Sequence, residues 1–254
     1  MKQQVTNLSV TLKFITIPTL AFGFICQNLS AQNILTREHT DVGVGFEDGA
    51  LNLHVHDETN DREFAPGEVT LRINSPSRTT VPGAASFGFL GAPGSSIWIL
   101  PNVQNPELLF LGIGAEEIEA GQFVGDSLSI RLRRVDGPGA FALYDLDSFG
   151  NPTIFMNSRD GISATDSFRV NAGAHGDLNW AFSSPGNYEI DFEASGVLVS
   201  GNANLTTGPV TYHFQVVPEP STWALIGIGL MSIVCRKLSR NSSTQPRIST
   251  DRNE

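Results

Sequence analysis

The sequence has 254 residues, a formal net charge of −10 and only two cysteines. Both cysteines, Cys26 and Cys235, lie near the ends, so residues 32–216 have no disulfide to form and no thiolate to offer a metal or a substrate. This region also has no lysine, and its nine arginines are outnumbered by 23 Asp and Glu residues, a formal net charge of −14. Such a surface repels nucleic acid and attracts cations, so the composition excludes nucleic-acid binding.

The first 31 residues have the pattern of a secretory signal peptide. Lys2 and Lys13 belong to a basic start, the apolar run FITIPTLAFGFIC follows, and the segment ends in NLSA before the polar Gln32. A basic start, a short apolar stretch and a small residue before a polar one indicate cleavage near Ala31. A retained membrane anchor is the alternative, although the apolar run is short for a spanning helix. We therefore expect residues 1–31 to be a signal peptide.

Residues 32–216 show no sustained helical period. Short segments that alternate apolar and polar residues recur between clusters of Gly, Pro, Asn and Asp, which is typical of an all-β sandwich or barrel. The segments are DVGVGF, LNLHVH, EVTLRI, SSIWIL, SLSIRLRRV, AFALYDL, TIFMN, SFRVN, LNWAFS, NYEIDFEA and VTYHFQV. The pattern predicts an antiparallel β-sandwich, immunoglobulin-like or jelly-roll-like, over residues 35–217, with residues 32–216 as one extracellular domain.

One stretch of this region, NWAFSSPGNYEIDFEASG, reads as a β-hairpin. The sequence SSPGN has turn chemistry, since Pro fixes φ and Gly accepts positive φ. The side chains expected to point inward are Trp180, Phe182, Tyr188, Ile190 and Phe192. Another stretch, GAEEIEAGQF, is acidic and short, and it predicts a turn or one helical loop.

The five histidines of the chain all lie in this domain. In ALNLHVHDE, Leu51, Leu53 and Val55 alternate with polar residues, so His54 and His56 share one face of a strand. Two imidazoles at this spacing can bind one metal ion, because both reach out from the same side. The alternative is that they are two solvated polar residues on the wet side of a sheet.

A second pair of the same spacing occurs in AGAHGDLNW, where Asp177 follows His175 by two residues. His39, just before the first strand, is the most favoured additional ligand. The predicted metal ligands are His39, His54, His56, His175 and Asp177. Three or four nitrogen and oxygen ligands without sulfur suit Zn²⁺, while Cu²⁺, Ni²⁺ and Mn²⁺ stay open. We interpret His213 as an ordinary strand residue. Asp57 and Glu58 are alternative extra ligands, although we favour the interpretation that they belong to the acidic surface.

The sequence gives little sign of catalysis. It contains no G-x-S-x-G nucleophile motif, no P-loop and no dinucleotide fingerprint. Carboxylate pairs such as Glu116 and Glu117, or Asp145 and Asp147, are expected by chance on so acidic a surface. We therefore expect the protein not to be an enzyme.

The C-terminal region reads VPEPSTWALIGIGLMSIVCRK. Val217-Pro218-Glu219-Pro220, an apolar run and the basic residues Arg236, Lys237 and Arg240 occur in that order, and together they resemble the PEP-CTERM sorting signal of bacteria. The resemblance covers residues 217–240. It implies recognition of Pro218, Glu219 and Pro220 by an exosortase, which is a membrane protease-transferase. The apolar run predicts a transmembrane helix near residues 222–238, and the basic residues after it predict that the polar tail, residues 241–254, is cytoplasmic.

A second resemblance covers residues 35–216. The runs EHTDVGVGFEDGALNLHVHDE, SIWILPNVQNPELLFLGIGAEEI, VDGPGAFALYDLDSFGNP and HGDLNWAFSSPGNYEIDFEASG are similar to the bacterial choice-of-anchor M domain. That family usually has His-x-His where this chain has His175-Gly176-Asp177, so one donor is a harder oxygen. The resemblance implies an extracellular domain with an interchangeable surface anchor, in a metal-handling context.

These observations predict an exported, exosortase-sorted cell-surface protein whose β-sandwich binds a divalent metal, with zinc favoured. The alternative is a structural or adhesive protein of the exopolysaccharide matrix, without a functional metal site. A metal-dependent hydrolase is the least favoured interpretation. The expected partners are the exosortase machinery, the membrane, and either exopolysaccharide or a metal-transport system.

Overall fold

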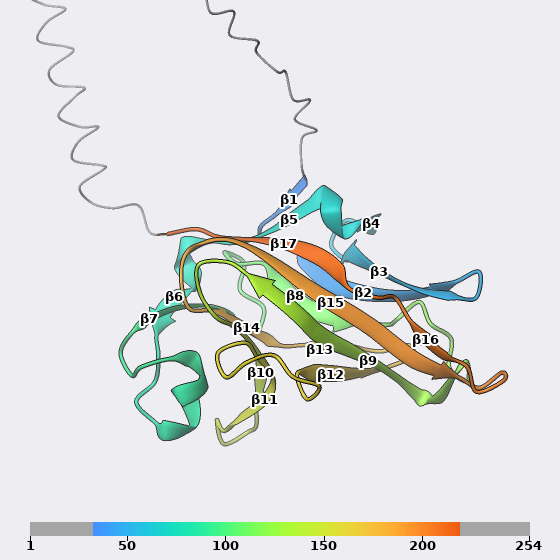
Figure 1. Ribbon diagram of the computed structural model, residues 1–254. Coiled ribbons are helices and arrows are strands. Elements are labelled where there is room, and N and C mark those ends of the chain that lie inside the picture. Colours follow the sequence, from blue (N-terminus) through green and yellow to red (C-terminus); the bar gives the residue numbers. More distant parts are fainter. Residues whose placement is uncertain (1–32, 219–254) are drawn as a thin grey trace, which may run out of the picture. The chain divides into compact units, whose positions relative to one another are not determined.

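The computed structural model describes residues 33–218, which form three β-sheets (Figure 1). This confirms the prediction of an all-β sandwich. The predictions of a signal peptide at residues 1–31, an apolar helix near 222–238 and a polar tail at 241–254 concern residues outside the described part of the chain. In the part that the structure describes, no helix has the length and apolar character needed to cross a membrane. Its helices are three short 3₁₀ segments: η1 (Pro66–Glu68), η2 (Ser75–Ser77) and η3 (Ala85–Leu90).

The first sheet, the seven-stranded sheet, has the order β1-β5-β17-β15-β9-β12, with β16 paired to β15. Its strands are β1 (Asn33–Leu35), β5 (Val69–Ile73), β9 (Phe123–Asp136), β12 (Ser167–Asn171), β15 (Gly186–Leu198), β16 (Asn204–Thr206) and β17 (Val210–Val216). Along β15 and β17 the buried residues alternate with exposed or half-buried ones, so one face of this sheet lies on the core.

The second sheet, the β10 sheet, has the order β11-β10-β14-β7-β6. Its strands are β6 (Arg78–Thr80), β7 (Ser96–Leu100), β10 (Phe141–Leu146), β11 (Pro152–Asn157) and β14 (Asn179–Phe182). All four residues of β14 are buried, which fits its place at the middle of the sheet.

The third sheet, which we call the histidine sheet, has the order β13-β8-β2-β3-β4. Its strands are β2 (His39–Glu47), β3 (Ala50–Asp57), β4 (Arg62–Phe64), β8 (Phe110–Gly114) and β13 (His175–Asp177). The β2 and β3 strands form a hairpin in which Gly43 lies opposite His54. Four of the five histidines belong to this sheet.

Most strand pairs are antiparallel, as predicted, but three pairs described here are parallel: β1 with β5, β5 with β17, and β2 with β8. A parallel pair needs a long connection that returns the chain to the same end of the sheet. Strands β3 to β7 lie between β2 and β8 and provide that connection. Alternation along one strand does not report strand direction, so the sequence pattern could not show this.

The predicted hairpin of Asn179 to Gly196 is wrong. Strand β14 pairs with β10 and β7, whereas β15 pairs with β9, β16 and β17, so the SSPGN turn carries the chain from one sheet to another. The inward side chains are nevertheless as predicted. The Trp180 ring centroid lies 5.9 Å from those of Phe192 and Phe214. Strands β14 and β15 therefore contact each other through large buried rings between two sheets, and not through hydrogen bonds between neighbouring strands of one sheet.

Two buried hydrogen bonds tie the histidine sheet to its neighbours. The hydroxyl of Tyr212 in β17 donates to the backbone carbonyl of His54 at 2.8 Å, and Trp180 Nε1 in β14 donates to the carbonyl of Leu111 at 2.8 Å. The face of the histidine sheet that packs on the core is apolar. Its buried residues are Val42, Val44, Leu51, Leu53, Val55, Phe64, Leu111 and Ile113. Because side chains alternate along a strand, the histidines lie on the opposite face.

Candidate metal centre

The polar face of the histidine sheet carries two rows of aligned residues. From β13 to β3, the first row consists of Asp177, Gly112, Asp41 and His56. The second row consists of His175, Gly114, Gly43 and His54. The sheet register therefore brings together polar side chains from strands that are far apart in the sequence.

Glycines in the middle of both rows make room for these side chains. A Cβ on Gly112 would overlap Oδ1 of Asp41, and one on Gly114 would lie 2.7 Å from Oδ2 of the same carboxylate. A Cβ on Gly43 would overlap the imidazole of His54. Any other residue at these positions would fill the space that the Asp41 carboxylate and the His54 ring occupy.

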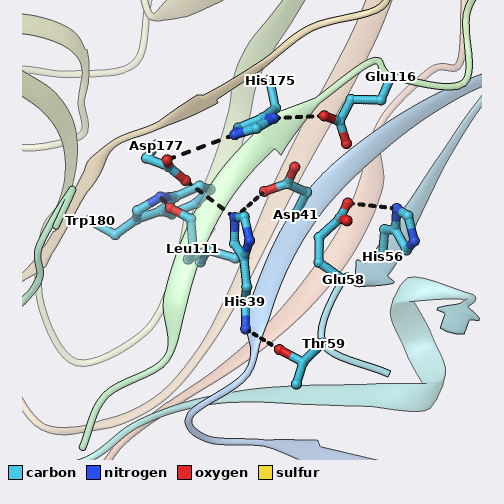
Figure 2. Close-up of polar contacts among 10 residues, drawn as sticks. All are labelled: His39, Asp41, His56, Glu58, Thr59, Leu111, Glu116, His175, Asp177 and Trp180. Carbon is cyan, nitrogen blue, oxygen red and sulfur yellow. Dashed lines mark hydrogen bonds and ion pairs between the residues drawn. The ribbon is translucent and has the colours of Figure 1, made fainter. Parts of the chain in front are cut away.

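The first cluster of potential ligands is the Asp41 group. It consists of His39, Asp41, His175 and Asp177. His39 Nε2 lies 3.4 Å from Asp177 Oδ1 and 4.0 Å from Asp41 Oδ1, and His175 Nε2 lies 3.8 Å from Asp177 Oδ2 (Figure 2). The ligand atoms that His39, His175 and Asp177 offer all lie within 4.8 Å of one another. One ion can therefore be reached by all three.

Asp41 is the most unusual residue of this group. It is only 2% exposed, and neither of its carboxylate oxygens has a hydrogen-bond partner. His39 Nε2 and Asp177 Oδ1, which lie nearby, are also buried without a hydrogen bond. Burial raises the pKa of Asp41 to about 6, although the neighbouring His39 and His175 lower it. Buried polar atoms are normally hydrogen-bonded, and a buried charge normally has a partner, so this concentration of unpaired atoms points to a cation.

His175 is held in place by a carboxylate outside the Asp41 group. Its Nδ1 lies 2.7 Å from Glu116 Oε1, and this hydrogen bond raises the pKa of His175 and lowers the pKa of Glu116. The Nε2 atom then faces Asp177 (Figure 2). A carboxylate on one imidazole nitrogen, with the other nitrogen directed into a site, is the usual arrangement around metal-binding histidines.

The second cluster is the His54 group. It consists of His54, His56 and Glu117. Their ligand atoms also lie within 4.8 Å of one another, and His54 Nε2 is 3.8 Å from Glu117 Oε1. Burial lowers the pKa of His54, which favours the neutral imidazole that a metal needs. Burial, together with the neighbouring Glu63, raises the pKa of Glu117.

Two further carboxylates lie between the groups. Glu116 is within reach of Asp41 and His175 on one side, and of His56 and Glu58 on the other. A cavity of about 10 Å³, large enough for about one water molecule, lies between the two groups. Its lining residues are Asp41, Gly43, Val44, His54, His56, Gly114, Glu116 and Glu117.

The five ligands predicted from the sequence all lie on this one face, but they do not form a single group. His39, His175 and Asp177 come together, and His54 and His56 form a separate set with Glu117. His213 lies on β17 in the seven-stranded sheet, opposite Glu189. Asp57 accepts hydrogen bonds from the backbone and side chain of Asn60, so it stabilises the turn after β3.

Sequence reasoning did not include Asp41, Glu116 and Glu117 of the candidate centre among the ligands, and it favoured the acidic surface for Glu58, which it named as an alternative extra ligand. One of them carried a signal, because His39 and Asp41 have the same His-x-Asp spacing as His175 and Asp177. The two glutamates after β8 had no such signal, since nothing in their local pattern separates them from the acidic surface.

A larger hollow of about 420 Å³ lies elsewhere, lined by residues of β5, β15 and β17 that include Thr70, His213 and Gln215. Gln215 donates a hydrogen bond to Asn187 and accepts one from Arg72, so polar groups there are already paired. The smaller cavity on the histidine sheet is lined by Asp41, whose two carboxylate oxygens are buried and unpaired, and we therefore place the candidate centre on this face.

Comparison with known proteins identifies the C-terminal signal. Residues 216–240 match the PEP-CTERM protein-sorting motif. The match confirms the signal predicted at residues 217–240, and it supports exosortase processing, export, and a final location at the cell surface or membrane. The chain is therefore an exported all-β protein with an exosortase sorting signal. The resemblance of residues 35–216 to the choice-of-anchor M domain stays a prediction.

The other comparisons add no functional information. No curated protein matches the chain. A solved structure that is similar to it is the ASH/PapD-like domain of human CEP192 (PapD-like domain 7), with 9% sequence identity and a TM-score of 0.19. The match covers 49% of this chain and 87% of that domain. At this TM-score the likeness supports no conclusion about the fold or the function.

Proposed function

We propose that this exported protein binds a divalent metal ion, with zinc favoured, at the Asp41 group. The observation that carries the proposal is the Asp41 carboxylate, which is 2% exposed and has no hydrogen-bond partner on either oxygen. Among the described ion pairs, every pair within the group joins a histidine to a carboxylate. A divalent cation would supply the positive charge and the contacts that these buried atoms lack.

The choice of metal follows from the donor atoms. Two imidazoles and two carboxylates, without a thiolate, form a set that Zn²⁺ accepts in tetrahedral geometry. Imidazole also suits Cu²⁺ and Ni²⁺, and carboxylate suits Mn²⁺, so a comparison of these ions is part of the test. The role of the bound ion would be capture or buffering of metal at the cell surface, or stabilisation of the domain.

The direct test is the metal content of the full-length chain, purified in detergent, stripped with a chelator and dialysed against limiting Zn²⁺. Elemental analysis should find zinc in the parent, and Asp41→Asn should lower the affinity at least tenfold because it removes the buried negative charge. His213→Gln is the control, since this histidine lies on another sheet and should not affect zinc.

The two roles of the ion are separated by removing it. If the chelator strips the zinc and the circular dichroism spectrum keeps its β-sheet form, the ion is captured and released. If the domain unfolds, the ion stabilises the fold. A parent chain that takes up no divalent metal would refute metal binding and leave the matrix-protein alternative.

A further inference from the structure

We infer that the domain binds a second divalent ion at the His54 group, beside the ion proposed for the Asp41 group. The inference rests on the proposed function, because it concerns the same face of the histidine sheet. It assigns to His54, His56 and Glu117 a site of their own with imidazole and carboxylate donors, which suits Zn²⁺ and similar ions.

The strand order separates the two groups. His175 and His54 lie in the same row of the sheet, but on β13 and β3, with β8 and β2 between them. At about 4.8 Å per strand, three strand spacings place their backbones about 14 Å apart. Among the described residues, the ligand atoms of His54 come within 4.8 Å of those of His56 and Glu117, whereas His39 groups with His175 and Asp177, so we assign the two groups to different ions.

Burial and a hydrogen bond on one ring nitrogen leave the other nitrogen of His54 available to bind a metal. It is 9% exposed, and its Nδ1 lies 3.2 Å from Asn52 Oδ1, so the side-chain amide of Asn52 accepts the Nδ1 proton. The lone pair of a neutral imidazole is then on Nε2, which is directed toward Glu117. Gly43, which has no side chain to block the ring, leaves this nitrogen accessible. A buried imidazole whose other nitrogen is fixed by a hydrogen bond is the arrangement expected of a metal ligand.

His56 also has a carboxylate beside it, in an ion-pair contact without a hydrogen bond. Its Nδ1 lies 2.9 Å from Glu58 Oε1, which leaves Nε2 free of that contact (Figure 2). The imidazole centroids of His54 and His56 are 6.3 Å apart. The two histidines therefore reach out side by side from β3, with Glu117 as the third donor.

The carboxylates between the Asp41 group and the His54 group supply negative charge for two neighbouring cations. Glu116 lies within reach of ligand atoms in both groups, and Asp41 lies opposite His56 across the strand pair. Two ions about 3.5–4 Å apart with shared carboxylate ligands are a common arrangement in proteins. The small cavity lined by Asp41, Glu116 and the His54 group lies where such an arrangement requires space.

The test counts ions in the full-length chain, purified in detergent, stripped with a chelator and dialysed against Zn²⁺ at increasing concentration. The parent and the His213→Gln control should each reach two zinc ions per chain. His54→Gln and His175→Gln should each reach one, and the double variant none. Because His54 is buried, Glu117→Gln repeats the test on a side chain that is 39% exposed, and this variant should fold like the parent and reach one ion.

The outcomes separate this inference from the proposed function. A parent that binds one ion and loses it in both single variants has one shared site, which overturns the second site and leaves metal binding in place. A parent that binds one ion and keeps it in His54→Gln and Glu117→Gln also overturns the second site. A parent that binds no ion overturns both proposals.

Discussion

Gly112 of β8 lies beside Asp41 of β2, and the absence of a side chain on Gly112 creates the space that the Asp41 carboxylate occupies. On the other side of Gly112, Asp177 of β13 is its paired residue. The glycine thus allows two carboxylates from non-adjacent strands to approach each other. This spacing brings the Asp41 carboxylate beside Asp177 and its neighbours His39 and His175.

Gly112→Ala should therefore impair metal binding. A Cβ at this position would overlap Asp41 Oδ1 and lie 3.2 Å from Asp177 Oδ1, so one carboxylate must move. We expect at least a tenfold loss of zinc affinity, equal to about 1.4 kcal/mol, and a loss of about 1–3 kcal/mol in the free energy of unfolding from overpacking. Titration calorimetry and urea denaturation measure the two effects.

The matched control is Gly83→Ala, because a Cβ on Gly83 meets no atom within 4 Å. This variant should bind zinc and unfold like the parent. If Gly112→Ala also keeps the parental zinc affinity, the Asp41 carboxylate does not contribute to the site.

The stability of the metal-free protein should depend on pH through Asp41. Burial raises the pKa of this carboxyl from 3.8 to about 6, so the folded protein binds its proton more tightly than the unfolded chain does. The folded state is then stabilised as the pH falls through about 6, and this contribution is lost as the pH rises again. Relative to Asp41→Asn, the parent should gain about 2–3 kcal/mol in free energy of unfolding between pH 7.5 and pH 4.

The pH dependence of stability must be measured as a difference between the parent and Asp41→Asn. The reason is that His54 changes the stability with pH in the opposite direction to Asp41. Burial lowers the pKa of His54, so its neutral form is favoured in the fold and acid destabilises the protein through this residue. Both proteins share that contribution, and it cancels in the difference. A parent-to-variant difference that stays constant from pH 7.5 to pH 4 would contradict the burial of an unpaired carboxyl.

Zinc binding should have the reverse pH dependence. A metal competes with protons for imidazole nitrogens, and the hydrogen bond that His175 donates to Glu116 raises the pKa of His175. We expect the zinc affinity to fall at least tenfold between pH 7.5 and pH 5.5, because imidazoles take up protons over this range and then no longer bind the metal. Competition with a chromophoric chelator at each pH measures this. An affinity that does not change over this range would show that the ion is held without histidine.

The alternating segments gave a good prediction of the strands, because a half-buried strand needs an apolar residue at every second position. Strand β8 was missed, since FLGIG contains two glycines and does not alternate clearly. Those glycines, Gly112 and Gly114, are the positions that make room for Asp41. The departure from the strand pattern thus coincides with the candidate centre.

The candidate centre could be predicted only as far as spacing within one strand allows. His54 and His56 share a face, and so do His175 and Asp177, as a period of two requires. The division of the ligands into two groups depends on which strands are neighbours and in which register. Strand β8 separates β2 from β13, and its parallel pairing with β2 cannot be read from residue spacing.

The hydrogen bond between Tyr212 and the backbone of His54 should support both the fold and the second metal site. Tyr212→Phe leaves the buried carbonyl of His54 without its donor, which should cost about 1–3 kcal/mol in the free energy of unfolding. Tyr144→Phe is the control, because the Tyr144 hydroxyl makes no hydrogen bond within the described residues. Urea denaturation of both variants makes the comparison. Equal stability of the two variants would show that the bond contributes nothing.

The sorting signal makes a prediction that does not depend on metal. Replacing Pro218, Glu219 and Pro220 with alanine removes the motif that gives the signal at residues 216–240 its name, so exosortase should no longer process the chain. The variant should accumulate in the membrane fraction at the unprocessed size, whereas the parent reaches its final location in a processed form. Fractionation and intact-mass measurement distinguish the two. Alanine replacement of Pro106 and Glu107, a Pro-Glu pair inside the β-domain, is the matched control and should be processed like the parent. Identical size and location of the triple-alanine variant and the parent would show that sorting does not use this motif.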